Sequence, residues 1–203
     1  MIKILSAVLA LSISSITLAA PITFNGKGDF DVKADYYAPE QTTSRAVLML
    51  HQCNHNRSMY NEVGPKLSEH GIHALSIDFR GFGESINQNT NVETIRALPQ
   101  EQRRQRWDEM TVHWEADVQQ AYNYLAKKVG KDGSIGVIGA SCGGRQARQL
   151  AETHDVTALS FFSLPFMNKD NAEEVNTFKE KVANKPTLFI TAEKDNTFVV
   201  TRY

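Results

Sequence analysis

Four short apolar runs constrain the fold of this chain more strongly than any other feature of its sequence. They are RAVLMLH (45–51), SIGVIG (134–139), VTALSFF (156–162) and PTLFIT (186–191). A continuous apolar run of this length is typical of a β-strand that is buried on both of its faces. Strands of this kind occur in parallel sheets that helices cover on both sides. The sequence therefore predicts an α/β protein with a mostly parallel sheet.

The segments between these runs complete an alternation of strands and helices. DFDVKADYYAP (29–39) alternates polar and apolar residues and stops at a proline, as a strand near a sheet edge does, and IHALSIDF (72–79) is a further strand. Helices are predicted over 58–71, with Ser58 as N-cap and Gly71 as the end, and over 107–129, 142–154 and 171–183. A polar insertion covers 86–106, within which Pro99 opens a short helix. Nothing divides the remainder, so residues 20–203 are predicted to form one domain.

The first nineteen residues have the pattern of a secretory signal peptide. Lys3 supplies a positive charge, Ile4 to Leu18 form an apolar stretch, and small residues stand at Thr17 and Ala19. A membrane anchor is the alternative, but the stretch is shorter than the roughly 20 apolar residues that a span needs. We therefore predict cleavage after Ala19 and export to the periplasm or the exterior, with no membrane contact afterwards.

The charge balance of the chain excludes one large class of partners. Its 22 Lys and Arg residues nearly match its 23 Asp and Glu residues, which gives a formal net charge of −1. A protein so close to neutrality has no broad field that would attract nucleic acid or anionic lipid. The densest basic run, 103–106, is more typical of a solvated helix face than of a phosphate clamp. A small molecule is therefore the expected partner, and nucleic acid is not.

The segment GASCGG (139–144) places a serine at the centre of the pattern G-x-S-x-G, where a buried strand gives way to a helix. A serine on so sharp a turn is held in strained backbone geometry and exposes its hydroxyl above the sheet. The alternatives are a plain connecting turn and a nucleotide-binding loop. The second fails because Gly136 and Gly139 have the wrong spacing for the dinucleotide pattern and no Gly-Lys-Ser/Thr follows. The pattern therefore predicts that Ser141, rather than Cys142, is a nucleophile.

Four segments together resemble the α/β-hydrolase superfamily, and within it the dienelactone-hydrolase-like branch. They are LMLHQCNHNRSMY, LSIDFRGFGES, IGASCGG and PTLFITAEKD, in the family's order, and they span nearly all of residues 29–195. The resemblance implies an α/β-hydrolase fold with an eight-stranded, mostly parallel sheet. It also implies hydrolysis of small carboxylic esters or lactones through a Ser-His-Asp mechanism with an acyl-enzyme intermediate. It calls for no cofactor and no metal.

The same resemblance implies where the oxyanion hole lies. One amide comes from the segment after VLMLH, where Cys53 is the first candidate and Gln52 the second, and the other belongs to Cys142. If both amides reach one oxygen, the Cα atoms of the two cysteines lie within the ~4.4–6.8 Å that a disulfide requires. In an oxidising compartment the pair is then expected to form a Cys53–Cys142 disulfide. Two buried free thiols are the alternative.

The resemblance leaves the catalytic base without a candidate. It makes Asp195 the acid that orients a histidine, with Glu193 as a nearby rival, but no histidine stands in 196–203, where the family has one. The six histidines of the chain are His51, His55, His70, His73, His113 and His154. A serine needs a base within ~2.6–3.2 Å of its Oγ. We therefore expect a C-terminally truncated hydrolase that lacks the last strand and helix and is inactive or very weakly active. A degenerate pseudo-enzyme is the alternative.

Two other functions compete with hydrolysis. HQCNH (51–55) puts His51, Cys53 and His55 at alternate positions, which on an extended strand would project to one side and hold zinc or copper. No fourth ligand is apparent, so a metal-binding module is the weaker reading, and a structural hydrogen bond is expected for His51. The other competitor is a non-catalytic α/β-hydrolase fold used for binding. Whether the α/β-hydrolase fold is catalytic or used for binding, the insertion 86–106 and the loop 163–171 are expected to line or cover the site.

Overall fold

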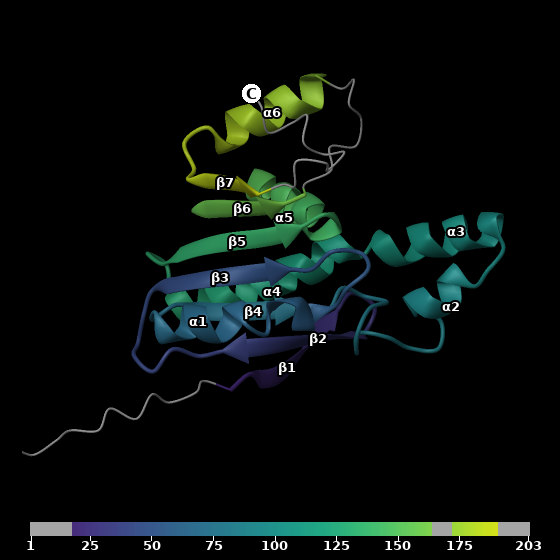
Figure 1. Ribbon diagram of the computed structural model, residues 1–203, viewed down its shortest axis with the longest axis horizontal. Helices are drawn as coiled ribbons and strands as arrows, with labels where there is room; N and C mark the ends of the chain where they lie inside the picture. The colour runs from purple at the N-terminus through teal and green to yellow at the C-terminus, as the bar shows by residue number, and fades with distance from the viewer. Residues whose placement is uncertain (1–17, 164–171, 191–203) are drawn as a thin grey trace, which may run out of the picture.

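The computed structural model describes residues 18–163 and 172–190, which form one layered α/β unit (Figure 1). Its strands are β1 (Ala20–Gly26), β2 (Phe30–Tyr37), β3 (Arg45–Leu50), β4 (His73–Ile77), β5 (Ser134–Ala140), β6 (Ala158–Phe162) and β7 (Thr187–Ile190). Its helices are the 3-10 helix η1 (Arg57–Tyr60) and the α-helices α1 (Val63–Glu69), α2 (Val92–Arg96), α3 (Gln100–Thr111), α4 (Trp114–Val129), α5 (Cys142–Thr153) and α6 (Ala172–Val182). The predicted α/β class is confirmed.

The seven described strands form one mixed sheet in the order β1-β2-β4-β3-β5-β6-β7. The neighbours from β4 through β7 pair in parallel, whereas β2 is antiparallel to both β1 and β4. The four apolar runs became β3, β5, β6 and β7. Burial on both faces is wrong for β7, where Leu188, Phe189 and Ile190 are exposed, because β7 pairs with one described strand only and stands at the end of the sheet order. β1 was not predicted, and because it covers the outer side of β2, the strand expected near the edge lies inside the sheet.

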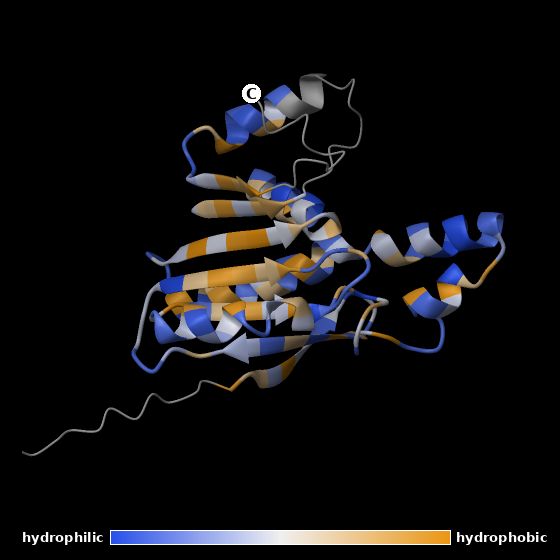
Figure 2. Ribbon diagram, viewed as in Figure 1, coloured by the Kyte–Doolittle hydropathy of each residue, from blue (hydrophilic) through white to orange (hydrophobic). Residues whose placement is uncertain are grey.

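Helices cover both faces of this sheet. α1 and η1 pack on one face, against β2, β3 and β4, and α4 and α5 pack on the other (Figure 1). The larger apolar core lies under α4 and α5 and includes Leu48, Leu125 and Phe161, while a smaller cluster around Tyr37 and Met49 lies under α1. The central strands β3 and β5 accordingly carry the broadest apolar bands (Figure 2). No helix in the described part of the chain is long and apolar enough to span a bilayer.

Two predicted helices are each divided in the structure. The helix expected over 58–71 is η1 followed by α1, and the predicted N-cap Ser58 is wrong. The side chain of Asn56 caps η1 instead, because its Oδ1 accepts the backbone N–H of Ser58 at 2.9 Å. Gly71 does follow α1, with a φ of 70° that suits the end of a helix.

The long helix expected over 107–129 is likewise two helices, α3 and α4, which break at Val112 and His113. The indole N–H of Trp114 donates to the Arg80 carbonyl at 3.0 Å and fixes the start of α4 over the core. α3 lies within and beyond the polar insertion and extends away from the sheet together with α2 (Figure 1). A spacing rule cannot detect such a break, because the apolar stripe continues through it.

Candidate active site

Ser141 stands between β5 and α5 in backbone geometry that few non-glycine residues adopt. Its φ is 48° and its ψ is −109°, and it occupies the N-cap position of α5 without a side-chain capping bond. Its backbone N–H donates to the Phe162 carbonyl of β6 at 2.9 Å, which ties the turn to the neighbouring strand. A φ in this region costs of order 1–3 kcal/mol for a serine. The strained turn predicted from the G-x-S-x-G pattern is present.

Two glycines allow this turn to form. A Cβ added at Gly139 would lie 2.5 Å from the Gly143 carbonyl oxygen and 2.7 Å from the Cα of Gly144. A Cβ added at Gly143 would collide with the Leu50 carbonyl oxygen at the end of β3. The first turn of α5 therefore packs directly on the backbone ends of β5 and β3, and only glycine leaves room for that approach.

A disulfide joins Cys53, in the loop after β3, to Cys142, the first residue of α5. The two Cα atoms are 5.5 Å apart although the residues are separated by 89 positions. The predicted pairing is confirmed, and the alternative of two free thiols is wrong. Within the described residues, no group accepts a hydrogen bond from the backbone N–H of Cys53 or of Cys142. The two segments predicted to supply the oxyanion hole thus meet beside Ser141.

His51 is fully buried and both of its ring nitrogens are occupied. The backbone N–H of Phe79 donates to Nε2 at 3.0 Å, which leaves the proton on Nδ1, and Nδ1 donates to the Gln52 carbonyl at 2.8 Å. Burial lowers the pKa of His51 to about 4, although the bond to Gln52 acts in the opposite direction. The ring is therefore neutral and has no lone pair for a serine proton, so the structural role predicted for it is confirmed.

The same contacts bear on the metal-binding alternative. His51 has no ring nitrogen left for a metal, and Cys53 is held in the disulfide. His55 is exposed, with Nδ1 3.2 Å from the Asn56 carbonyl. Across residues 18–163 and 172–190, no three His, Cys, Asp or Glu side chains gather as a metal site would require. The three residues of HQCNH therefore do not converge on one point.

Two more histidines lie at the opposite end of the sheet from Ser141. His70 and His73 flank the start of β4, and β4 runs parallel to β3 and β5. They are therefore at the amino end of the parallel strands, whereas Ser141 is at the carboxyl end. His113 lies between α3 and α4, in the break described above.

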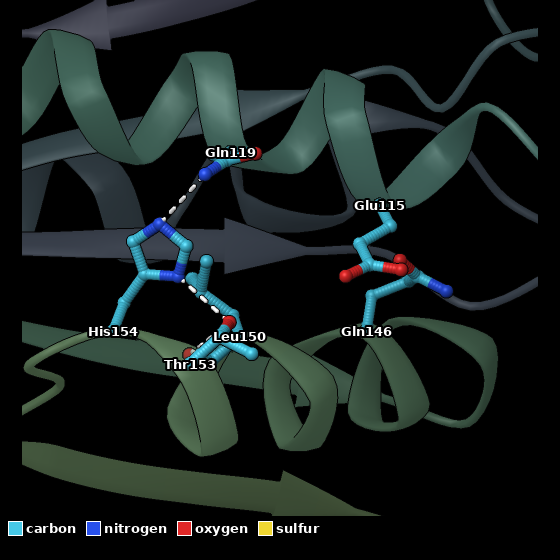
Figure 3. A pocket seen from close by; sticks show the side chains of 6 residues that line it. All are labelled: Glu115, Gln119, Gln146, Leu150, Thr153 and His154. Atoms are coloured by element: carbon cyan, nitrogen blue, oxygen red, sulfur yellow. Dashed lines mark hydrogen bonds between the residues drawn. The ribbon is translucent and has the colours of Figure 1, made fainter.

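His154 lies at the far end of α5 from Ser141. The 12 residues of α5 rise by ~1.5 Å each and so separate the two by about 18 Å. Its ring borders a cavity of about 270 Å³ between α4 and α5, where Nε2 is 3.0 Å from the Gln119 amide nitrogen and Nδ1 is 2.8 Å from the Thr153 hydroxyl (Figure 3). This cavity also contains Glu115 and Gln146, and it is separate from the serine turn.

The polar insertion contacts the loop that carries Cys53. Arg96 of α2 donates from Nη2 to the Cys53 carbonyl at 2.8 Å and pairs with the exposed Glu93. A cavity of about 240 Å³ lies beside this contact, and Asn54, His55, Phe82 and Arg96 are among the residues that line it. Part of the insertion expected to cover the site therefore borders the Cys53 loop.

Two ion pairs with a fully buried carboxylate were not predicted. Asp78, directly after β4, accepts the backbone N–H groups of Arg57 at 2.7 Å and Glu84 at 2.8 Å, and also pairs with the Arg57 guanidinium. Arg80 donates twice to the buried Asp117, from Nε and Nη2 at 2.9 Å each. Burial raises the pKa of Asp117, and the bonds from Arg80 offset part of that effect. The only signal in the sequence was the charged pattern of DFRGFGES.

The predicted acid Asp195 and its rival Glu193 lie outside the described residues, as does most of the loop 163–171. Their roles remain predictions. Of the predicted site, the structure brings together Ser141, Cys53 and Cys142.

Comparison with known proteins places this fold in a family. The sequence profile of the alpha/beta hydrolase fold family matches residues 45–164, and the chain belongs to that family. No curated protein sequence matches the chain. The dienelactone-hydrolase-like branch stays a prediction.

Several solved structures have a similar fold. One is a cold-adapted esterase from an Arctic intertidal metagenomic library, with a TM-score of 0.66 and 18% identity over 93% of this chain and 82% of that one. Another is the epoxide hydrolase VrEH1 from Vigna radiata, with a TM-score of 0.55 and 16% identity over 83% of this chain and 46% of that one. A third is epoxide hydrolase A from Mycobacterium thermoresistibile, with a TM-score of 0.52 and 17% identity over 81% of this chain and 45% of that one. The chain thus spans less than half the length of these two epoxide hydrolases.

Proposed function

We propose that this protein is a serine hydrolase of small carboxylic esters or lactones, with Ser141 as the nucleophile. The observation that carries the proposal is the strained backbone of Ser141, at φ 48°, on a turn whose next residue is linked to the Cys53 loop. Strain of this kind persists only where surrounding contacts impose it, and it is concentrated at functional sites. The fold similarity to an esterase is consistent with this reaction class.

The chemistry follows from the groups around Ser141. Its Oγ attacks the carbonyl carbon, and the carbonyl oxygen becomes an oxyanion that accepts hydrogen bonds from the N–H groups of Cys53 and Cys142. Collapse of this intermediate expels the alcohol and leaves an acyl-enzyme, which water then hydrolyses. Each such donor is worth about 3–4 kcal/mol in the transition state. The amino end of α5 adds a partial positive charge at the same place.

The base that takes the proton of Ser141 is not one of the six histidines in this proposal. His51 is buried with both nitrogens bonded, and His154 is about 18 Å away along α5. Asp195 is proposed as the acid that would orient a histidine. We therefore expect slow reaction of Ser141 in this protein, because a serine without a base is a weak nucleophile.

Export is part of the same proposal. A disulfide is stable in oxidising compartments and is rare where thiols are kept reduced, and β1 begins at Ala20, directly after the proposed cleavage point. The pattern of residues 1–19 is the main support. Amino-terminal sequencing of the mature protein tests it, since a first residue other than Ala20 would contradict the assignment.

A fluorophosphonate probe, which reacts with activated serines, tests the nucleophile. We expect slow modification at Ser141, located by mass spectrometry of peptides, and none in Ser141→Ala. Ser163→Ala is the matched control, because Ser163 also has a positive φ, of 49°, at a strand end. Equal modification of Ser141→Ala and the parent protein would remove the basis of the proposal, and no modification at all would favour a binding protein with this fold.

A second pair of variants tests the base. His55 and His70 are both exposed, and each has Nδ1 near a backbone carbonyl. His55 lies two residues from Cys53, whereas His70 lies at the other end of the sheet. His55→Gln and His70→Gln are both expected to leave the rate of modification unchanged. A loss in His55→Gln alone would identify His55 as the base.

A further inference from the structure

The disulfide connects the two backbone segments that the proposed reaction requires to act together. β3 and β5 are adjacent parallel strands, with Leu50 opposite Gly139, and the Cys53 loop and α5 continue from their carboxyl ends. The link at a Cα separation of 5.5 Å fixes how far apart those continuations lie. It therefore acts on the spacing between the peptide N–H groups of Cys53 and Cys142.

Both of these N–H groups are without a hydrogen-bond acceptor in the described residues, although two N–H groups close to them have one. The N–H of Ser141 donates to Phe162, and the N–H of His55 donates to the Gln52 carbonyl at 3.1 Å. An unpaired amide at this place is available to a ligand oxygen. Since the donors are main-chain groups, they are present whichever side chain stands at either position.

Other contacts hold the two segments unequally. α5 is fixed by its close packing on the ends of β3 and β5, where Gly143 meets the Leu50 carbonyl. Cys53 lies in a turn that is closed by the bond from the His55 N–H to the Gln52 carbonyl at 3.1 Å, and it packs in part against the core. Its carbonyl oxygen receives one hydrogen bond, from the exposed Arg96, which the exposed Glu93 also engages. An exposed contact of this kind contributes little to rigidity. Of these contacts, the disulfide is the one that links Cys53 directly to α5.

We propose that the Cys53–Cys142 disulfide positions the oxyanion hole, so that the reactivity of Ser141 depends on the redox state of the protein. This inference rests on the function proposed above. Reduction by a dithiol breaks the Sγ–Sγ bond, transfers two electrons and two protons to the cysteines, and leaves the reagent as a cyclic disulfide. Both N–H donors survive, but the Cys53 donor is no longer held at a fixed distance from the Cys142 donor. A newly made chain consequently gains reactivity when its cysteines are oxidised.

The size of the effect follows from the loss of one positioned donor. Removing a donor from an oxyanion hole slows catalysis by about 10²–10³-fold. Reduction displaces a donor without deleting it, so a loss of roughly 10- to 100-fold is expected. Reduction should lower kinact, the maximal rate of serine modification. It should leave KI, the probe concentration that gives half of this maximal rate, unchanged. A disulfide that served stability alone would change neither quantity in protein that remains folded.

The experiment measures kinact and KI for a fluorophosphonate probe with oxidised protein, with protein reduced by dithiothreitol, and with Cys53→Ala/Cys142→Ala. Far-UV circular dichroism confirms folding at the assay temperature, which is set well below each midpoint of unfolding. We expect a 10- to 100-fold lower kinact and an unchanged KI in the reduced protein and in the double variant. Dithiothreitol should have no effect on the double variant, which controls for direct effects of the reagent.

The outcomes separate this inference from the function on which it rests. If Ser141 of the oxidised protein is modified and all three folded forms react equally fast, the disulfide is structural and the inference is wrong. If Ser141 is not modified even in the oxidised protein, the proposed function fails first.

A variant that retains both cysteines covers the case in which the double variant does not fold. Arg96→Gln removes the other contact to the Cys53 peptide. It should lower kinact by no more than about twofold in the oxidised protein, where the disulfide holds the loop, and by a further factor of roughly 2 to 5 in the reduced protein. Equal losses in the two redox states would overturn the inference.

Discussion

Replacing Gly139 by alanine is expected to disrupt the serine turn, whereas the same change three residues earlier on β5 is expected to be tolerated. A Cβ at Gly139 would lie 2.5 Å from the Gly143 carbonyl oxygen and 2.7 Å from the Gly143 carbonyl carbon. Both are backbone atoms, and ordinary contact begins at ~3.5 Å, so β5 and α5 would have to separate by about 1 Å. At Gly136 the nearest atoms are 3.6 Å, 3.7 Å and 3.8 Å away, which is ordinary contact.

These distances predict opposite changes in the free energy of unfolding for the two variants. Overpacking costs about 1–3 kcal/mol, and the upper end applies to Gly139 because the strand and the helix cannot yield locally. With a change of roughly 2–4 °C in the unfolding midpoint for each kcal/mol, Gly139→Ala should lose about 6–12 °C. Gly136→Ala should gain up to about 1 kcal/mol, because alanine restricts the unfolded chain more than glycine does.

Thermal unfolding followed by circular dichroism measures both changes, and the rate of fluorophosphonate modification reports on the site. A shift of about 1 Å at the turn should slow modification of Ser141 by roughly 10²-fold in Gly139→Ala and leave it unchanged in Gly136→Ala. If the two variants unfold within about 1 °C of each other, the close approach of β5 and α5 does not shape the turn.

Two further predictions concern buried charge and its dependence on pH. Asp117→Asn leaves the Arg80 guanidinium without its buried counter-charge and should lower the free energy of unfolding in urea by about 3–5 kcal/mol. Glu109→Gln, in an exposed pair, should change it by less than about 1 kcal/mol, and similar losses in both would refute the distinction. Because burial lowers the pKa of His51 from 6.5 to about 4, the unfolded chain binds a proton between these pH values that the native protein does not. The free energy of unfolding should therefore fall by about 3 kcal/mol as pH decreases across that interval. His51→Gln should remove this part of the pH dependence, and an unchanged slope would show that His51 is not its source.

The sequence was informative where local patterns determine the outcome. Strands β3 and β5 are continuous apolar runs, and the serine turn carries its glycines at fixed spacing, so both could be recognised without tertiary information. β1 was missed although Ile22 and Phe24 alternate with polar residues, because it begins directly after the predicted signal peptide. The break before Trp114 was missed for a different reason. It depends on a hydrogen bond to Arg80, 34 residues away in sequence, which no periodicity reveals.

The disulfide was predicted because a functional assumption implied a short distance between its two cysteines. The two ion pairs were not predicted because no such assumption applied to them. Two amides that serve one oxygen must be close, so their residues must be close, whatever separates them in sequence. No comparable requirement linked Asp78 to Arg57 or Asp117 to Arg80, since the value of those pairs depends on burial that only the folded chain supplies. Long-range contacts are therefore readable from sequence to the extent that a reaction demands them. The Gly139 variant tests the local shape of the turn that the reaction requires. The cysteine variants test the distance between the N–H groups of Cys53 and Cys142.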